Sequence, residues 1–171
     1  PDNRILDIVR PTVVFGEGNR GNVFNLVNQI SSGRFAMVGN GENYKSMAYV
    51  GNLVAFIKYL LENRKPGMEI YNYTDKPDLS MNELVDIIEK NLSLSKHRLS
   101  IPKSLGLLTG YGFDLISKLL GKSLPISSVR IKKFCANTTF NTSKVQSKTS
   151  FLPPYSLSEG LHKTIKYDFI P

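Results

Sequence analysis

The residues best suited to chemistry form a glycine-rich loop at 16–21, with the sequence GEGNRG. This G-x-G-x-x-G spacing, between a strand-like and a helix-like run, is typical of loops whose backbone amides cradle a dinucleotide pyrophosphate. Two features argue against that use. Pro11 removes a hydrogen-bond donor from what should be a central parallel strand, and Glu42, the nearest acidic residue after the next predicted strand, lies beyond a Gly-Asn-Gly turn. We therefore interpret the loop as a turn and not as a cofactor fingerprint.

The remaining reactive side chains are sparse. Cys135 is the single cysteine, so it has no internal disulfide partner, and it forms no metal-ligand cluster with the two distant histidines, His97 and His162. A reducing, cytoplasmic environment fits this usage best. The longest apolar stretches, such as 53–61, fall short of the roughly 20 residues that a membrane span needs.

The net charge of +8 would favour nucleic acid, an anionic surface or a phosphorylated small ligand. Apart from the run at 130–133, the cations are scattered, and few aromatic residues alternate with them as a stacking platform would require. A solvated basic surface is the preferred interpretation over nucleic-acid binding. The length of 171 residues and a hydrophobic content of 41% suit one soluble unit, and the start at Pro1 without methionine or export signal suggests a fragment or processed chain.

Hydrophobic periodicity predicts an alternation of strands and helices. Strands are expected at 5–15, 35–38, 46–50 and 68–73, with the second and third forming a small hairpin-like pair. Helices are expected from Asn22 as N-cap to a stop at Gly33, over 53–61, after capping boxes at Ser80 and Ser156, and with uncertain limits within 102–136.

Several ordered motifs together resemble the extended short-chain dehydrogenase/reductases, the NAD-dependent epimerase/dehydratase proteins. These motifs are RPTVVFG at 10–16, FAMVG at 35–39, KSMAYV at 45–50, NLV at 52–54, the capping box at 80–83, TFNTSK at 139–144 and LSEGL at 157–161. The resemblance extends from Arg10 to about Tyr167 and is weakest over 99–126. It implies that the cofactor fingerprint and the catalytic Tyr-x-x-x-Lys lie upstream, and none of the eight tyrosines here has lysine four positions later.

The resemblance implies an α/β fold that is the C-terminal portion of such a protein. Remnant strands and a helix of the Rossmann-like domain are expected at 1–21 and 51–79. A mainly helical substrate-binding lobe with a small sheet is expected at 22–50 and 80–171. The catalytic residues lie outside this chain, so the chain alone is expected to be inactive and to need the missing N-terminal half of the same protein.

The resemblance assigns only one short segment of this chain to the cofactor. By resemblance, the backbone of Pro11, Thr12 and Val13 lies beside the nicotinamide of NAD, or possibly NADP. Many epimerases have asparagine where this chain has Val13, which puts a strict UDP-galactose 4-epimerase assignment in doubt. Asn52 stands where aspartate is usual, and we expect it to cap the following helix.

The substrate side is expected to hold a UDP- or dTDP-sugar. Asn22 and Val23 fall at a helix N-terminus near the diphosphate, where free amides and the helix dipole suit an anion. Ala36 and Val38 fall where the family holds the pyrimidine, although ordinary strand packing explains them equally well.

Two cations complete the implied substrate site. Lys45 stands where many relatives have arginine, and it lacks the bidentate guanidinium fork. Arg130 falls close to a second family arginine that reaches the phosphates. For both residues the alternative is a surface charge.

The implied reaction is transient oxidation of a sugar hydroxyl by NAD and return of the hydride, giving epimerisation, dehydration or reduction. A homo-oligomer is expected. The alternative from a different class is a non-enzymatic basic module that binds a phosphorylated ligand or nucleic acid.

Overall fold

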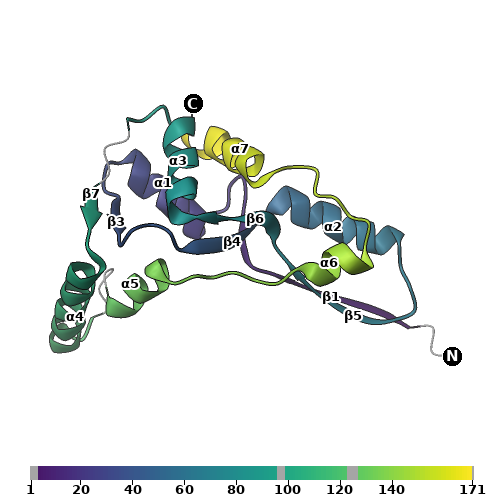
Figure 1. The fold of residues 1–171 in the computed structure, drawn as a ribbon, viewed down its shortest axis with the longest axis horizontal. Helices are drawn as coiled ribbons and strands as arrows, with labels where there is room; N and C mark the ends of the chain where they lie inside the picture. The colour runs from purple at the N-terminus through teal and green to yellow at the C-terminus, as the bar shows by residue number, and fades with distance from the viewer. Residues whose placement is uncertain (1–3, 96–98, 123–126, 171) are drawn as a thin grey trace.

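The computed structural model describes residues 4–95, 99–122 and 127–170, which form an arched α/β structure (Figure 1). The strands are β1 Ile5–Pro11, β2 Val13–Phe15, β3 Ala36–Val38, β4 Tyr44–Tyr49, β5 Gly67–Tyr73, β6 Asp75–Ser80 and β7 Leu99–Ile101. The helices are α1 Asn22–Ser31, α2 Val50–Glu62, α3 Met81–Asn91, α4 Lys103–Leu120, α5 Ser128–Cys135, α6 Ser143–Lys148 and α7 Leu157–Phe169.

The predicted strand at 5–15 is two strands that belong to different sheets. β1 pairs with β5 in parallel, from Ile5 beside Gly67 to Pro11 beside Tyr73, and β2 pairs with β4. The two strands are separated by Thr12, whose amide still donates to the Tyr73 carbonyl of β5 over 3.2 Å. Among the described strands β1 pairs only with β5, so most of it is exposed and the prediction of a buried strand was wrong.

The predicted hairpin of 35–38 with 46–50 was also wrong. β3 pairs in parallel with β7, and β4 lies between β2, in parallel, and β6, in the antiparallel direction. The short strand β6 was not predicted, because its sequence, DKPDLS, has the composition of a loop. These small sheets and the helices around them confirm the predicted α/β class.

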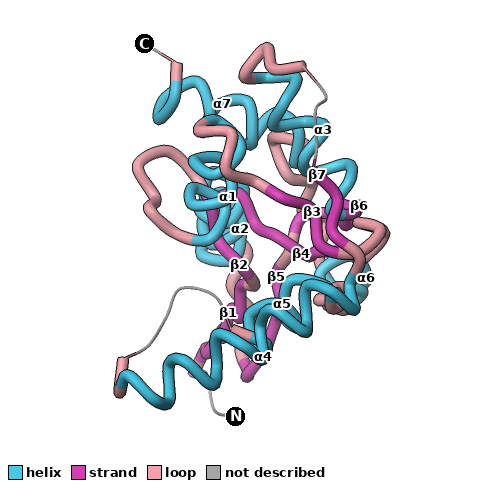
Figure 2. The backbone as a smooth tube through the Cα atoms, turned by 90° about the vertical axis from the view of Figure 1, so that its left-hand side faces the viewer, coloured by secondary structure: helices cyan, strands magenta, loops and turns pink. Residues whose placement is uncertain are grey.

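The apolar side chains form two separate clusters. The larger one is enclosed by α1, α3 and α7 against β2 and β4, with Val27, Ile88 and Leu161 at its centre. Figure 2 shows these three helices gathered at the end of the molecule where the chain terminates. The smaller cluster lies between α2, β5 and α6 and is built around Phe56, which stacks on Tyr73 with ring centroids 4.8 Å apart.

Helix ends follow local sequence closely. Both predicted capping boxes are present, at Ser80 and at Ser156, where each serine and the glutamate three residues later bond to each other's backbone amides. The prediction of Asn22 as an N-cap was wrong by one position. Gly21 is the N-cap of α1, and it provides no side-chain hydrogen bond to the helix.

The capping box of α3 makes the stability of the fold depend on pH. Ser80 donates from its amide to the Glu83 carboxylate over 2.7 Å, and this bond lowers the pKa of Glu83 from its ordinary value of 4.5. A lowered folded-state pKa gives a stabilisation that is present above 4.5 and is lost as the pH falls through the folded value. We expect Glu83→Gln to flatten the acid side of the profile of unfolding free energy against pH, measured by urea unfolding of the full-length protein. Glu159→Gln in the matching box of α7 should do the same, and an unchanged slope for both variants would contradict this assignment.

Candidate functional site

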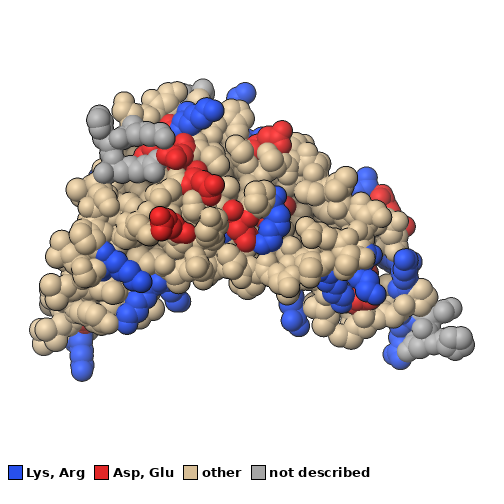
Figure 3. All heavy atoms as spheres, viewed as in Figure 1, with Lys and Arg blue, Asp and Glu red and all other residues tan. Residues whose placement is uncertain are grey.

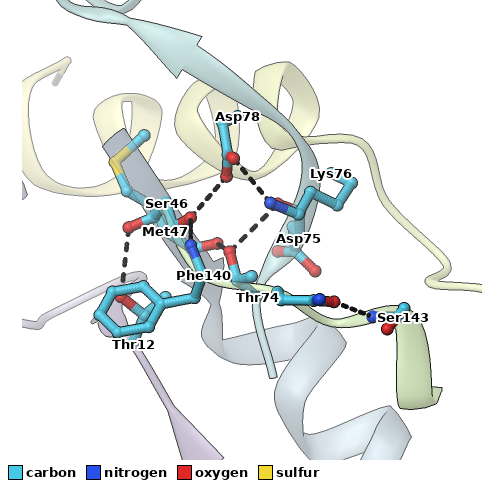
Figure 4. Close-up of polar contacts among 10 residues, drawn as sticks. Thr12, Ser46, Met47, Thr74, Asp75, Lys76, Asp78, Phe140 and Ser143 are labelled. Atoms are coloured by element: carbon cyan, nitrogen blue, oxygen red, sulfur yellow. Dashed lines mark hydrogen bonds and ion pairs between the residues drawn. The ribbon is translucent and has the colours of Figure 1, made fainter. Parts of the chain in front are cut away.

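A buried serine, Ser46, joins two of the segments on which predicted site residues lie, those of Thr12 and Lys45. Ser46 of β4 donates its hydroxyl to Asp78 over 2.6 Å and accepts the amide of Phe140 at 3.0 Å (Figure 4). Its carbonyl accepts the Thr12 hydroxyl at 3.3 Å. The second Asp78 oxygen pairs with Lys76 at 2.6 Å. The junction of β1 and β2, the strands β4 and β6, and the segment before α6 are therefore tied together at one point.

The segment that follows α5 lies along β4. Ser46 donates its amide to Thr138 over 2.8 Å, and Thr138 donates its own amide to Tyr44 over 2.9 Å. The Asn137 side chain accepts the Tyr44 amide at 2.8 Å. This short parallel bridge places α5 next to β3 and β4.

Lys45 fastens the end of α5 to β4. Its ammonium donates to the carbonyls of Lys133 and Ala136 over 3.0 and 2.6 Å. These carbonyls belong to the last turn of the helix, which has no intrahelical partners for them. Burial lowers the pKa of Lys45, and the nearby Cys135 partly opposes this shift. The structure gives Lys45 a bridging role that the sequence did not suggest, and its contact with substrate stays a prediction.

A hollow of about 530 Å³ opens where β3 ends, between the start of α4 and the end of α5. Its lining residues are Val38, Gly39, Asn40, Asn43, Pro102, Lys103 and Cys135. Val38 and Pro102 provide apolar walls, two asparagines provide amide groups, and Lys103 provides a positive charge. The Asn43 amide is held by the Phe134 carbonyl at 2.8 Å. This combination suits a polar ring or sugar close to an anionic group.

Three of the residues predicted to bind substrate lie on the elements around this hollow, namely Val38, Lys45 and Arg130. Arg130 is exposed in the first turn of α5, whose N-cap Ser127 accepts the Arg130 amide at 3.2 Å. Residues two apart on a helix point in directions about 200° apart, so Arg130 and Lys132 face different sides. Lys132 faces α4, where its ammonium lies 5.2 Å from the centroid of the Tyr111 ring.

The other predicted substrate residues have structural surroundings. Ala36 pairs with Leu99 and is half-buried in β3. Val23 is buried in the larger apolar cluster, and Asn22 precedes it as the first residue of α1. The same turn packs on the end of α7 through Phe24 and Phe169.

In the glycine-rich loop at 16–21, two backbone amides already donate to side chains, one in α7 and one in the loop itself. The Gly18 amide donates to Asp168 over 3.2 Å, and the Gly21 amide donates to Asn19 over 2.8 Å. The Glu17 carboxylate accepts the Tyr49 hydroxyl at 2.9 Å, which, together with burial as the main cause, raises the pKa of Tyr49. The Asp168 carboxylate and the Asn19 side chain already accept the amides of Gly18 and Gly21, which a pyrophosphate would need, so the arrangement supports our interpretation of the loop as a turn.

The segment predicted to lie beside a nicotinamide turns its polar groups inward. Thr12 donates its amide to Tyr73 over 3.2 Å and its hydroxyl to Ser46. Pro11 and Val13 on either side are exposed. The segment therefore offers apolar surface, which suits the face of an aromatic ring.

Asn52 has a role that sequence reasoning missed. It is the third residue of α2, so it does not cap this helix, and it is fully buried. Its side-chain amide donates to the Tyr155 carbonyl over 2.8 Å, and its oxygen accepts the Tyr155 amide at 3.0 Å. It thus holds the segment before α7 against α2. The bond from Ser46 to Asp78 was also missed, because it joins two strands that are distant in sequence.

In the described ranges, no three side chains of His, Cys, Asp or Glu are grouped so that they could hold a metal ion. No helix in the same ranges has the length and apolar character needed to cross a membrane.

Comparison with known proteins identifies relatives of the whole arrangement. A family model described as the 3-beta hydroxysteroid dehydrogenase/isomerase family matches residues 7–103. The chain is 56% identical over 170 residues to an N-acetyl-alpha-D-glucosaminyl-diphospho-ditrans,octacis-undecaprenol 4-epimerase of Escherichia coli O157:H7, covering 99% of this chain and 51% of that protein. It is 26% identical to a UDP-glucose 4-epimerase of Vibrio cholerae, covering 92% of this chain and 44% of that protein.

Solved structures show the same fold. A UDP-glucuronic acid 4-epimerase from Bacillus cereus, crystallised in complex with NAD, superposes with a TM-score of 0.63 at 19% identity, over 94% of this chain and 44% of that one. The chain spans about half the length of the curated relatives it matches. It belongs to the 3-beta hydroxysteroid dehydrogenase/isomerase family, among the extended short-chain dehydrogenase/reductases of the epimerase/dehydratase type.

Proposed function

We propose that this chain is the substrate-binding side of a longer NAD-dependent enzyme that inverts C4 of an N-acetylated sugar carried on a diphosphate. The observation that carries the proposal is the 56% identity, over nearly the whole chain, to a 4-epimerase whose substrate is an N-acetylglucosaminyl diphosphate. The Vibrio cholerae relative, a UDP-glucose 4-epimerase, supports the same reaction on a diphosphate-linked sugar. Alone, the chain is expected to be inactive, because no tyrosine in it precedes a lysine by four positions.

The two apolar clusters follow the proposed division of the chain in part, since Val145 of α6 lies in the smaller cluster and Phe15 of β2 lies in the larger one. The cluster around Phe56 includes α2 and β5, within the proposed cofactor-side segment 51–79. The larger cluster joins α1, α3 and α7, within the proposed substrate-side segments 22–50 and 80–171. Ser46 and Asp78 connect the two parts.

The group attached to the diphosphate has two candidates. A nucleoside, uridine or thymidine as in a UDP- or dTDP-sugar, would place its base in the hollow beside Val38 and Pro102. A polyprenol is favoured by the identity to the Escherichia coli protein, which is twice that to the UDP-glucose 4-epimerase. Both candidates present the same diphosphate to the protein, and we assign Arg130 to it.

For the cofactor, the residues present fit one limited role. The exposed Pro11 and Val13 would lie against the nicotinamide of NAD, while Thr12 is held in place by Tyr73 and Ser46. When bound, the cofactor supplies reversible hydride transfer. The chain's own residues position this segment and leave the pyrophosphate to be bound upstream.

The loop at 16–21 gives a sharp test of that division. We expect Gly18→Asn in the full-length protein to leave the dissociation constant for NAD within about twofold, well below 1 kcal/mol. Gly18 has a φ of 74° and open space around it, and asparagine tolerates this backbone region better than other residues. Isothermal titration with NAD measures the effect. A tenfold or greater loss of NAD affinity in a folded variant would mean that the loop binds the dinucleotide.

The proposed reaction is tested with the full-length protein and added NAD. UDP-N-acetylglucosamine and N-acetylglucosaminyl-diphospho-undecaprenol are supplied separately, the second in detergent, and the sugars released by mild acid are separated by chromatography. We expect N-acetylgalactosamine from at least one substrate, and the faster substrate identifies the attached group. If neither yields an epimerised sugar, the proposed function is wrong.

A further inference from the structure

Helix α4 points three leucine side chains into solvent. Leu108, Leu115 and Leu119 are 68%, 62% and 78% exposed. Their spacing, i, i+7 and i+11, places them on one side of the helix. The exposed residues Leu105 and Ile116 fall on the same side. A helix that rests on a protein normally turns such a stripe inward, so this orientation calls for a cause.

Glycines on the opposite side of α4 fix this orientation. Gly106 and Gly110 are the buried residues of the helix. A Cβ atom at Gly106 would lie 2.6 Å from Val38 Cγ1, and one at Gly110 would lie 2.9 Å from the Ser128 backbone. Only glycine permits this close approach, because side chains at these positions would collide with β3 and α5. The leucine stripe is therefore held outward by the way the helix is attached.

The surroundings of the stripe are strongly basic. Residues 103–136 contain six cations and one acidic residue, and these are Lys103, Lys118, Lys122, Arg130, Lys132 and Lys133 against Asp114. The Asp114 carboxylate accepts the Ser128 amide at 3.2 Å, which partly offsets its charge. Figure 3 shows basic side chains gathered at this end of the molecule. The surface thus combines an apolar stripe with flanking positive charge.

The position of α4 leaves this surface uncovered by the upstream part of the enzyme. α4 and α5 form one end of the arch, and β1 and β5 form the other (Figure 1). The upstream strands of the sheet would continue from the exposed side of β1. Because that side lies at the opposite end, the missing half would not cover the leucine stripe.

We propose that α4 and the cations beside it dock on an anionic lipid bilayer, with the leucine stripe of α4 in the interface. An amphipathic helix with lysines at its flanks binds such surfaces by burying its apolar side chains while the ammonium groups meet anionic headgroups. The inference goes beyond the proposed function and takes from it only the position of the upstream half. It would bring the hollow at the start of α4 close to a substrate carried by a membrane lipid.

The test compares matched leucines in the full-length protein by co-sedimentation with vesicles of equimolar phosphatidylglycerol and phosphatidylcholine. Leu119→Gln should lower the partition coefficient about tenfold, and the combined Leu108→Gln, Leu115→Gln and Leu119→Gln variant more than about a hundredfold. Leu152→Gln alters an equally exposed leucine, 84% exposed in the loop before α7, and should change nothing. Lys118→Glu with Lys122→Glu should weaken binding to these vesicles and not to pure phosphatidylcholine.

Other occupants of the stripe give different results. If a second copy covers it, the triple variant changes the sedimentation coefficient without altering vesicle binding, and the proposal is overturned. If the upstream half covers it, the triple variant is destabilised while vesicle binding is unchanged, which also overturns it. Epimerase activity on detergent-solubilised substrate separates the two proposals, because it tests the reaction without a bilayer.

Discussion

Replacing Asn52 with leucine is expected to lower the free energy of unfolding by about 2 to 4 kcal/mol. The Asn52 side chain is fully buried and bonds both the amide and the carbonyl of Tyr155. Leucine has a similar volume but no polar atoms, so both backbone groups would lose their partner. The segment before α7 would then detach more easily from α2. Chemical denaturation of the full-length protein measures the loss.

A matched change at the other end of the same helix provides the control. Asn63 is exposed and its side chain donates to the Tyr59 carbonyl over 2.8 Å, where water can replace it. We expect Asn63→Leu to cost less than about 1 kcal/mol. Equal effects at the two positions would mean that the buried contact with Tyr155 contributes little.

Replacing Arg130 with alanine is expected to weaken binding of the sugar diphosphate at least about tenfold and to leave NAD binding almost unchanged. Arg130 lies in the first turn of α5, the helix whose last residue, Cys135, lines the hollow at the end of β3. A guanidinium contact with a partly shielded phosphate is worth about 1.5 to 3 kcal/mol, whereas a solvated arginine contributes almost nothing. Dissociation constants for UDP-N-acetylglucosamine and NAD, measured separately on the full-length protein, test this expectation.

Lys133→Ala is the control for Arg130→Ala. It removes a positive charge from the same helix, three positions further on, and leaves the Lys133 carbonyl available to Lys45. We expect a change below about twofold. An equal loss in the two variants would indicate a general effect of charge, and no loss in either would make Arg130 a surface residue.

Much of the fold could be predicted where local sequence decides it. The capping boxes at Ser80 and Ser156 each need only four consecutive residues, and both helices begin where expected. The pairing of strands could not be predicted, because it depends on partners distant in sequence. Thus 35–38 pairs with 99–101, and not with the neighbouring strand at 46–50.

The candidate site was less accessible from sequence than the fold. Resemblance indicated which residues to consider, but it could not show that Lys45 binds the end of α5 or that Asn52 holds Tyr155. Both contacts join residues about ninety or more positions apart, and both use polar side chains whose types suit several roles. The glycine-rich loop shows the converse case. Its spacing fits the cofactor motif, but its Gly18 amide donates to the Asp168 carboxylate.

The central claim is that this chain binds the sugar diphosphate while the upstream part binds most of NAD. Hydrogen–deuterium exchange on the full-length protein, with each ligand added separately, tests it most directly. We expect the sugar diphosphate to slow exchange at 35–46 and 128–138, around the hollow. We expect NAD alone to slow exchange upstream and at the amides of Thr12 and Val13, and to leave the loop at 16–21 unchanged. Protection of that loop by NAD, with no protection around the hollow by the sugar diphosphate, would contradict the account.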